Sequence, residues 1–391
     1  MNHIIVRIGT NAVFLRLVLT AIMEKTKRYN SVDLLRGAIM LLMAVDHVRV
    51  YSGIPANSAD PAIFFTRWIT HFCVSGFVFF AGVSAFLYGE KLNNKRALSG
   101  YLITRGIFLV VLELTLLRFC WTFNLNFGQF MLAGVIWMLG WCMVLLAGVI
   151  WLPFRSIWII GLLIIAGEQL FGKVPASIHW WNFFYPIDYD GIKWISILYV
   201  LLPWIGVMMA GYGFGRILQM EAARRRKICL TIGLSAIAAF VVIGTLVIVM
   251  SDPQPRPFIF RLLGQQKYPP SQLYLLMTLG PIIALVPFAE RAGGWLARVL
   301  STFGRVPLFY YIVHILLIHV AALLVNLLRT GHTHQDWYET APYTEISANL
   351  RWSLPLLYLV FILVEVILYF ICKRYAKYKF QHPEIKLLKY L

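Results

Sequence analysis

Long apolar runs separated by short polar connections recur along the chain from Val32 to Cys372. A run of about 20 apolar residues crosses a bilayer as a helix, because hydrocarbon offers no partner for an open backbone hydrogen bond. The pattern therefore predicts an all-α, polytopic transmembrane helical bundle with about ten spans. These are expected at residues 32–52, 63–88, 98–120, 129–152, 155–171, 193–218, 228–250, 270–289, 301–328 and 351–372.

The connections between these spans alternate in charge. Lysine and arginine are enriched in the cytoplasmic loops of membrane proteins, so the alternation predicts that both termini are cytoplasmic. The fifth expected span is short, and it is needed to keep the alternation in phase. The basic connections contain Lys25, Lys27, Arg28, Lys91, Lys95, Arg96, Arg224, Arg225, Arg226, Lys227, Arg291, Arg298, Lys373, Arg374, Lys377 and Lys379.

The first 22 residues are apolar but are interrupted by Arg7 and Arg16. They lack a small-residue cleavage site before Glu24, which argues against a cleaved signal peptide. Two alternatives stay open: an amphipathic helix in the membrane interface, or a true start at Met23. We therefore divide the chain into an N-terminal leader, residues 1–27, and one transmembrane domain, residues 28–391.

Composition agrees with a membrane protein, since 60% of the residues are hydrophobic and 13% are charged. The formal net charge of +18 comes from short loops and the tail. This placement indicates orientation signals and contacts with anionic lipids, and it argues against nucleic-acid binding. The five cysteines are scattered and show neither a disulfide framework nor metal-ligand spacing. No metal is expected.

Ionisable residues inside a membrane are costly and usually face a cavity or a partner. The first span holds Asp33, Arg36, Asp46, His47 and Arg49. Asp33 can pair with Arg36, and Asp46 with Arg49, each at a spacing of three. Arg36 and His47 lie within about 20° on one helix face, separated by a rise of about 16 Å. An arginine suits phosphate binding and a histidine suits general-base catalysis; snorkelling anchors are the simpler alternative.

The second span carries Arg67, His71 and Ser75 at spacings of four, which predicts one polar stripe along its outer half. His71 is then expected at the depth of His47, and the two would share a polar cavity. The alternative is that these residues serve interhelical hydrogen bonds.

Other polar residues are isolated within their spans. Arg105 lies near the cytoplasmic end of the third span, either close to the phosphate region of Arg36 or as an anchor, and Glu113 lies deeper. His314 and His319 are five residues apart, about 140° around a helix, so they are not expected to bind one metal ion. Glu365 is also expected to be buried.

Several segments resemble a known family. They are residues 28–47, 65–73, 77–82, 202–207, 267–271 and 304–310. In this order they are similar to bacterial membrane proteins of the heparan-alpha-glucosaminide N-acetyltransferase and YeiB type, over roughly residues 28–390. The spacing of Arg36 and His47 is also similar to the Arg-(ten residues)-His pattern of the acyltransferase-3 family. The resemblance implies an acyl-CoA bound from the cytoplasmic side and an acyl group delivered across or within the membrane.

The chain departs from the lysosomal acetyltransferase in one respect. That enzyme is thought to use a histidine in the lumenal loop after its first helix, whereas the loop from Gly53 to Ala62 has none. His47 falls where that enzyme has an asparagine, and His71 where it has an aspartate. The catalytic base therefore rests on the acyltransferase-3 pattern, and the acceptor does not carry over.

These observations lead to one hypothesis and two rivals. We expect an N- or O-acyltransferase of the bacterial inner membrane that moves an acyl group from acetyl-CoA to a hydroxyl or amine, on a glycan or another envelope molecule. The rivals are a transporter of an anion or proton and a silent scaffold; a homodimer stays open. The expected catalytic residues are His47, His71 and Asp46, and the expected donor- and acceptor-binding residues are Arg36, Arg105, Arg67, Ser75 and His314.

Overall fold

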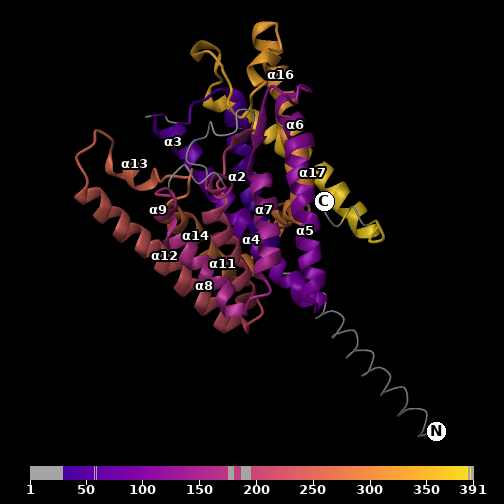
Figure 1. The fold of residues 1–391 in the computed structure, drawn as a ribbon. Helices are drawn as coiled ribbons and strands as arrows, with labels where there is room; N and C mark the ends of the chain where they lie inside the picture. Colours follow the sequence, from indigo (N-terminus) through magenta and orange to yellow (C-terminus); the bar gives the residue numbers. More distant parts are fainter. Residues whose placement is uncertain are drawn as a thin grey trace, which may run out of the picture. The chain divides into compact units, whose positions relative to one another are not determined.

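The computed structural model describes residues 30–56, 58, 60–174, 180–185, 195–385 and 388, and the leader expected at residues 1–27 lies outside them. Helices dominate the described chain (Figure 1). The longer ones are α2 (Asn30–Ser52), α4 (Phe72–Leu92), α5 (Lys95–Leu112), α7 (Val135–Val149), α8 (Phe154–Ala166), α11 (Leu202–Leu218), α12 (Ala222–Met250), α14 (Gln272–Ala289), α15 (Gly294–Arg305), α16 (Pro307–Thr330) and α17 (Leu354–Gln381).

Short elements connect these helices. They are α3 (Pro61–Trp68), the 3₁₀ turn η1 (Ile69–His71), the π-helical turn η2 (Glu113–Leu117), α6 (Arg118–Thr122), α9 (Glu168–Phe171), α10 (Trp181–Phe184), α13 (Phe258–Leu263), η3 (Gln335–Tyr338) and η4 (Ala348–Leu350). Strands β1 (Met131–Ala133) and β2 (Ile195–Ile197) pair in parallel. They occupy the expected starts of the fourth and sixth spans, so those helices begin later than predicted, at Val135 and Leu202.

Six segments of the described chain are long and apolar enough to cross a membrane: Pro61–Leu92, Lys95–Thr122, Ala222–Met250, Gln272–Ala289, Pro307–Thr330 and Leu354–Gln381. The other four expected spans also contain a helix. Three of these, α7, α8 and α11, have 15, 13 and 17 residues, and the fourth, α2, carries four charged residues. The structure thus supports a helical integral membrane protein, while the ten-span count and the orientation stay predictions.

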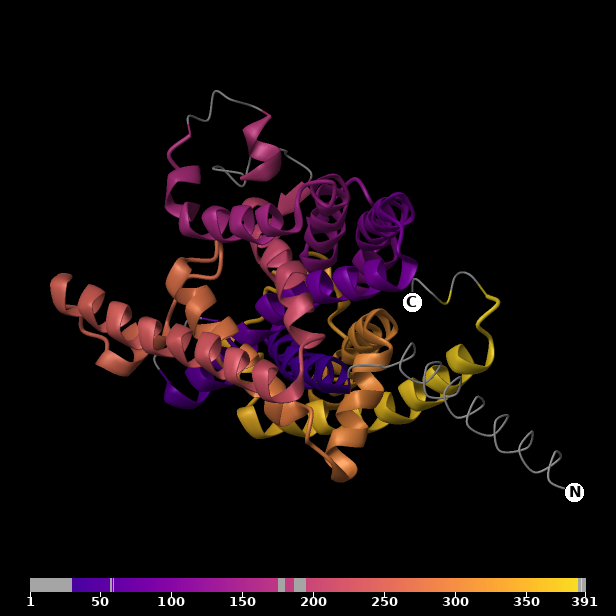
Figure 2. The same cartoon turned by 90° about the horizontal axis from the view of Figure 1, so that it is seen from below.

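Burial distinguishes the inner helices from those suited to face lipid. Within its most apolar window, only 17% of α12 is buried, against 61% of α14. Figures 1 and 2 show α12 at the margin of the helices. In contrast, most residues of α2 are buried, although the helix carries four charged residues. An inner position gives those charges protein partners that lipid would not supply.

A 3₁₀ turn interrupts the second predicted span within the stripe of Arg67, His71 and Ser75. The side chain of Asp60 caps α3, and the 3₁₀ turn η1 then separates α3 from α4. A 3₁₀ turn rotates the chain by about 120° per residue instead of about 100°, so Arg67 is turned relative to the residues that follow the turn.

The ninth predicted span is also two helices. Val306 has a non-helical backbone conformation, with a φ of −133°, and it separates α15 from α16. Pro307 lies in the first turn of α16. Proline lacks the N–H that an interior helix position needs, whereas it is well tolerated at a helix start. The break lets α15 approach α2 independently of α16.

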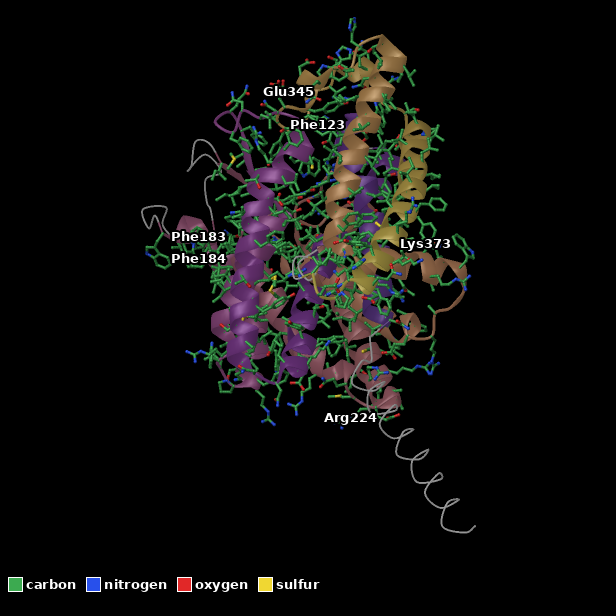
Figure 3. All side chains as sticks on the ribbon, turned by 90° about the vertical axis from the view of Figure 1, so that its right-hand side faces the viewer. Phe123, Phe183, Phe184, Arg224, Glu345 and Lys373 are labelled. Atoms are coloured by element: carbon green, nitrogen blue, oxygen red, sulfur yellow. The ribbon has the colours of Figure 1, made fainter. Side chains whose placement is uncertain are left out.

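The described domain has distinct ends. Figure 3 shows Arg224 at one end of the helices and Phe123 and Glu345 at the other. Near the first end, Arg225 binds Glu290 through two hydrogen bonds of 2.6 and 2.9 Å. The same guanidinium donates to the carbonyl oxygens of Leu218 and Met220, so it ties α11, α12 and α14 together.

Replacing Arg225 with glutamine is expected to lower the free energy of unfolding by about 1 kcal/mol, because a partly exposed ion pair contributes little beyond its hydrogen bonds. Thermal unfolding of the detergent-solubilised protein measures the change. Arg226→Gln is the matched control, since Arg226 is an exposed neighbour on the same helix. Equal unfolding midpoints for the two variants would contradict a joining role for Arg225.

Candidate active site

A cavity of about 540 Å³ lies between the C-terminal half of α2, the η2–α6 segment and the loop that precedes α17. Its lining is mixed: Asp46, His47 and Arg49 come from α2, Glu113 comes from η2, and Glu345 comes from the loop. Aromatic walls are supplied by Trp121, Tyr199, Tyr268, Tyr311 and Tyr343. Figure 3 shows Glu345 at the end of the helices opposite Arg224. Because Glu345 lines the cavity, the cavity lies toward the end away from Arg224. A polar cavity of this size can hold a small ligand or a sugar-sized group.

His47 is held on three sides. Its Nδ1 lies 2.7 Å from Nε2 of His314 on α16, and the two rings are nearly parallel. The ring of Trp121 packs edge-on at 4.8 Å, and that of Tyr311 at 6.0 Å. Among the described residues, Nε2 of His47 has no hydrogen-bond partner. One ring nitrogen is therefore fixed by the protein, and the other is available to a ligand in the cavity.

Asp46 is bound to Arg49 rather than to His47. The Arg49 guanidinium donates to Oδ1 of Asp46 at 2.8 Å and to the carbonyl oxygen of Ile54, also at 2.8 Å. This confirms the pairing at a spacing of three. The carboxylate lines the cavity, but its charge is already balanced by a neighbour.

His71 does not share the cavity with His47, contrary to the sequence prediction. His71 is buried, and it is absent from the described residues that line the cavity. The ring of Tyr274 packs edge-on against it, while the Tyr274 hydroxyl donates to its backbone carbonyl at 2.6 Å. The His71 ring therefore packs against α14.

The flanking residues of that segment make local or interhelical contacts. Ser75 accepts a hydrogen bond of 2.8 Å from Thr278 on α14, and both side chains are fully buried. Arg67 donates to the carbonyl oxygen of Ala56 at 3.3 Å. The geometry of Ser75 thus favours the alternative in which these polar groups join helices. Their roles in ligand binding stay predictions.

Arg36 and Arg105 lie outside the described lining of the cavity. Arg36 binds α4, where its Nη2 donates to the carbonyl oxygen of Phe80 and to the Ser84 hydroxyl. Arg105 donates to the Tyr101 hydroxyl at 3.0 Å. Arg36 contacts α4 whereas His47 contacts α16, so the expected common cleft along α2 stays a prediction.

Two charged residues around the cavity, Glu113 and Lys267, lie in surroundings that no sequence pattern predicts. Glu113 was expected to be deep, but its carboxyl group lies at the start of α7, so close that a Cβ added to Gly134 would meet Oε1 at 2.3 Å. Backbone N–H groups at a helix start favour an acidic side chain. No local motif marks this contact, because η2, α6 and β1 separate the two positions in the chain.

Lys267 is a second residue that was not singled out. It is buried in the loop between α13 and α14, with Nζ over the rings of Tyr268 at 5.1 Å and Tyr199 at 6.0 Å. Burial alone would lower the pKa of Lys267. The combined effect of Tyr268, Tyr274 and Asp46 is larger and raises the pKa above its ordinary value, so the amine stays charged. A lysine next to Tyr268, in the segment at residues 267–271, was the available signal.

His319 points away from His314, as its spacing predicted. Its Nδ1 lies 3.1 Å from the carbonyl oxygen of Cys120, and its ring stacks on Phe123 at 3.8 Å. Within the described part of the chain, no group of three histidine, cysteine, aspartate or glutamate residues is placed to hold a metal ion.

Membrane-spanning helices around a polar cavity with an available histidine nitrogen define an integral membrane protein with a candidate active site. The chain belongs to the family of the heparan-alpha-glucosaminide N-acetyltransferase catalytic domain, whose model matches residues 28–251, more than half of the 391 residues. No curated protein matches the chain. The family confirms the resemblance and supports a membrane acetyltransferase. The matched range contains Asp46 and His47 and ends before His314.

Proposed function

We propose that this protein is an acyl-CoA-dependent acyltransferase that moves an acetyl or related acyl group to a hydroxyl or amine. The observation that carries the proposal is the position of His47, which lines the cavity with Nδ1 bound to His314 and Nε2 available. An imidazole held in this way suits general-base catalysis, provided that the reacting group comes within hydrogen-bond reach. Membership of the acetyltransferase family supports the reaction type.

The proposed reaction is a direct acyl transfer. Nε2 of His47 takes a proton from the acceptor hydroxyl or amine as that group attacks the thioester carbonyl. The carbon–sulfur bond then breaks, the acyl group stays on the acceptor, and the departing CoA sulfur takes up the proton. A transient acyl-histidine is the alternative route, in which Nε2 itself attacks the thioester.

The donor is proposed to enter from the cytoplasmic side. Arg36 and Arg105 would bind the CoA phosphates, and the pantetheine arm would cover the rise of about 16 Å from Arg36 to His47. Arg36 already binds α4, so this role requires it to accept a phosphate beside that contact. The acceptor would occupy the outer cavity, where tyrosine rings and the carboxylate of Glu345 suit a glycan or another polar envelope molecule. The location is proposed to be the bacterial cytoplasmic membrane.

The test uses the full chain in proteoliposomes with acetyl-CoA labelled in the acetyl group. We expect CoA release and label transfer when an amino sugar such as glucosamine, or an envelope glycan, is present on the side opposite the donor. Empty liposomes and liposomes with His47→Ala protein are the controls. Uptake of a labelled anion with no CoA release would contradict the proposal and favour the transporter.

A further inference from the structure

His314 is fully buried in α16, and its hydrogen bonds determine which ring nitrogen carries the proton. Its Nδ1 lies 3.0 Å from the backbone carbonyl oxygen of Tyr310, one turn earlier in the same helix. A carbonyl oxygen only accepts hydrogen bonds, so this nitrogen must be the donor. In a neutral ring the other nitrogen, Nε2, is then an acceptor.

The partner of that acceptor is His47. Nε2 of His314 lies 2.7 Å from Nδ1 of His47, so Nδ1 of His47 must donate. Because a neutral imidazole carries one proton, Nε2 of His47 is left with a free lone pair. We infer that His314 is a positioning residue that holds His47 in the tautomer with Nδ1 protonated and Nε2 basic, toward the cavity.

The alternative is a charged His314 that donates through both nitrogens. It would place a cation in a fully buried position, which is costly unless an acid balances it. Among the described contacts, both ring nitrogens of His314 face neutral groups, the carbonyl oxygen of Tyr310 and the ring of His47, and neither is hydrogen-bonded to an acid; the nearest carboxylate on α2, that of Asp46, binds Arg49. The contacts thus favour a neutral His314.

The ring of His314 is fixed by packing. Tyr310 stacks on the His314 ring at 5.1 Å, and its hydroxyl lies 3.3 Å from the carbonyl oxygen of Met40 in α2. The ring of Tyr311 also packs edge-on against His314, at 5.3 Å. His314 therefore has little freedom to rotate. It lies outside the described cavity lining, so it acts through His47 and not on a ligand, which differs from the donor-binding role predicted from the sequence.

The first test measures the tautomer directly and rests on no activity. The full chain, labelled with ¹⁵N-histidine, is placed in lipid nanodiscs without substrate, and the His47 signals are assigned by their loss in His47→Gln. We expect a protonated Nδ1 and an unprotonated Nε2. A protonated Nε2 in the unmodified protein would overturn the inference.

The second test uses two substitutions at position 314. His314→Leu removes the acceptor and is expected to let protonated Nε2 appear at His47, whereas His314→Gln offers a carbonyl oxygen near the position of Nε2 and is expected to keep Nδ1 protonated. An unchanged His47 tautomer in His314→Leu would overturn the inference. His332→Leu, at an exposed histidine, is the control for labelling and folding.

The catalytic consequence rests on the proposed function. His314→Leu is expected to lower kcat for acetyl transfer about 10–100-fold, as loss of an orienting partner commonly does, with little change in KM for acetyl-CoA. His314→Gln is expected to recover most of the loss. If the unmodified protein shows the expected tautomer but no transfer, the proposed function fails and the positioning role stands. If transfer occurs and His314→Leu leaves kcat unchanged, the positioning role fails.

Discussion

Replacing His47 with alanine is expected to lower acetyl transfer by about 10²–10⁴-fold, the usual contribution of a general base. The loss should appear in kcat, because His47 lines the cavity whereas Arg36, in the proposed phosphate region, lies outside its described lining. The measurement is single-turnover transfer of labelled acetyl groups from acetyl-CoA in proteoliposomes, with protein content and thermal unfolding checked for each variant.

Two controls separate catalysis from folding. His47→Gln fills a similar volume and can still bond to His314, but it has no basic nitrogen, so it should be as inactive as His47→Ala. His332→Ala removes an exposed histidine from the loop after α16 and should keep full activity. A folded His47→Ala protein that transfers acetyl groups at the rate of the unmodified protein would exclude the base role.

The helices could be predicted from the sequence because a bilayer leaves few alternatives. Each expected apolar run contains a helix, since backbone groups in hydrocarbon must bond within their own segment. The errors lie at helix starts. Strands β1 and β2 replace the first residues of two predicted spans, and Val306 divides another. Apolar composition alone cannot distinguish a strand or a break from the first turn of a helix.

The site was predictable only where its contacts are local. The pair of Asp46 and Arg49 follows from helical spacing, and it is present. His47 and His314 are 267 positions apart in the sequence, and no periodicity within α2 or α16 predicts their contact. The stripe of Arg67, His71 and Ser75 is interrupted by the 3₁₀ turn between Arg67 and Ser75, although His71 and Ser75 both contact α14. Tertiary packing, not local pattern, assembles this cavity.

The buried location of α2 connects the fold to the proposed chemistry. Its charged residues find partners only inside the protein, so the helix must be packed closely on several sides. Glycines make this possible where α2 crosses α15. A Cβ built on Gly304 would lie 1.8 Å from the carbonyl oxygen of Asp33, and one on Gly37 would lie 1.8 Å from that of Leu300. The backbones of the two helices are therefore in direct contact.

Replacing Gly304 with alanine is expected to destabilise the protein by about 3 kcal/mol or more, because the added methyl group meets rigid backbone instead of a side chain that can move. The clash would push α2 away from α15 and shift His47 relative to His314, so acetyl transfer should fall as well. Thermal unfolding in detergent and transfer in proteoliposomes measure the two effects.

Gly100→Ala is the matched control, because Gly100 lies within α5 and no heavy atom approaches its Cβ position within 4 Å. Alanine is favoured over glycine inside a helix by up to about 1 kcal/mol, so this variant should unfold at the same temperature or slightly higher. Gly37→Ala should behave like Gly304→Ala, since it presses on the same crossing from the other side. Unfolding midpoints for Gly304→Ala and Gly37→Ala that match Gly100→Ala would show that α2 and α15 do not touch backbone to backbone. In that case the packing that holds His47 against His314 would need another source.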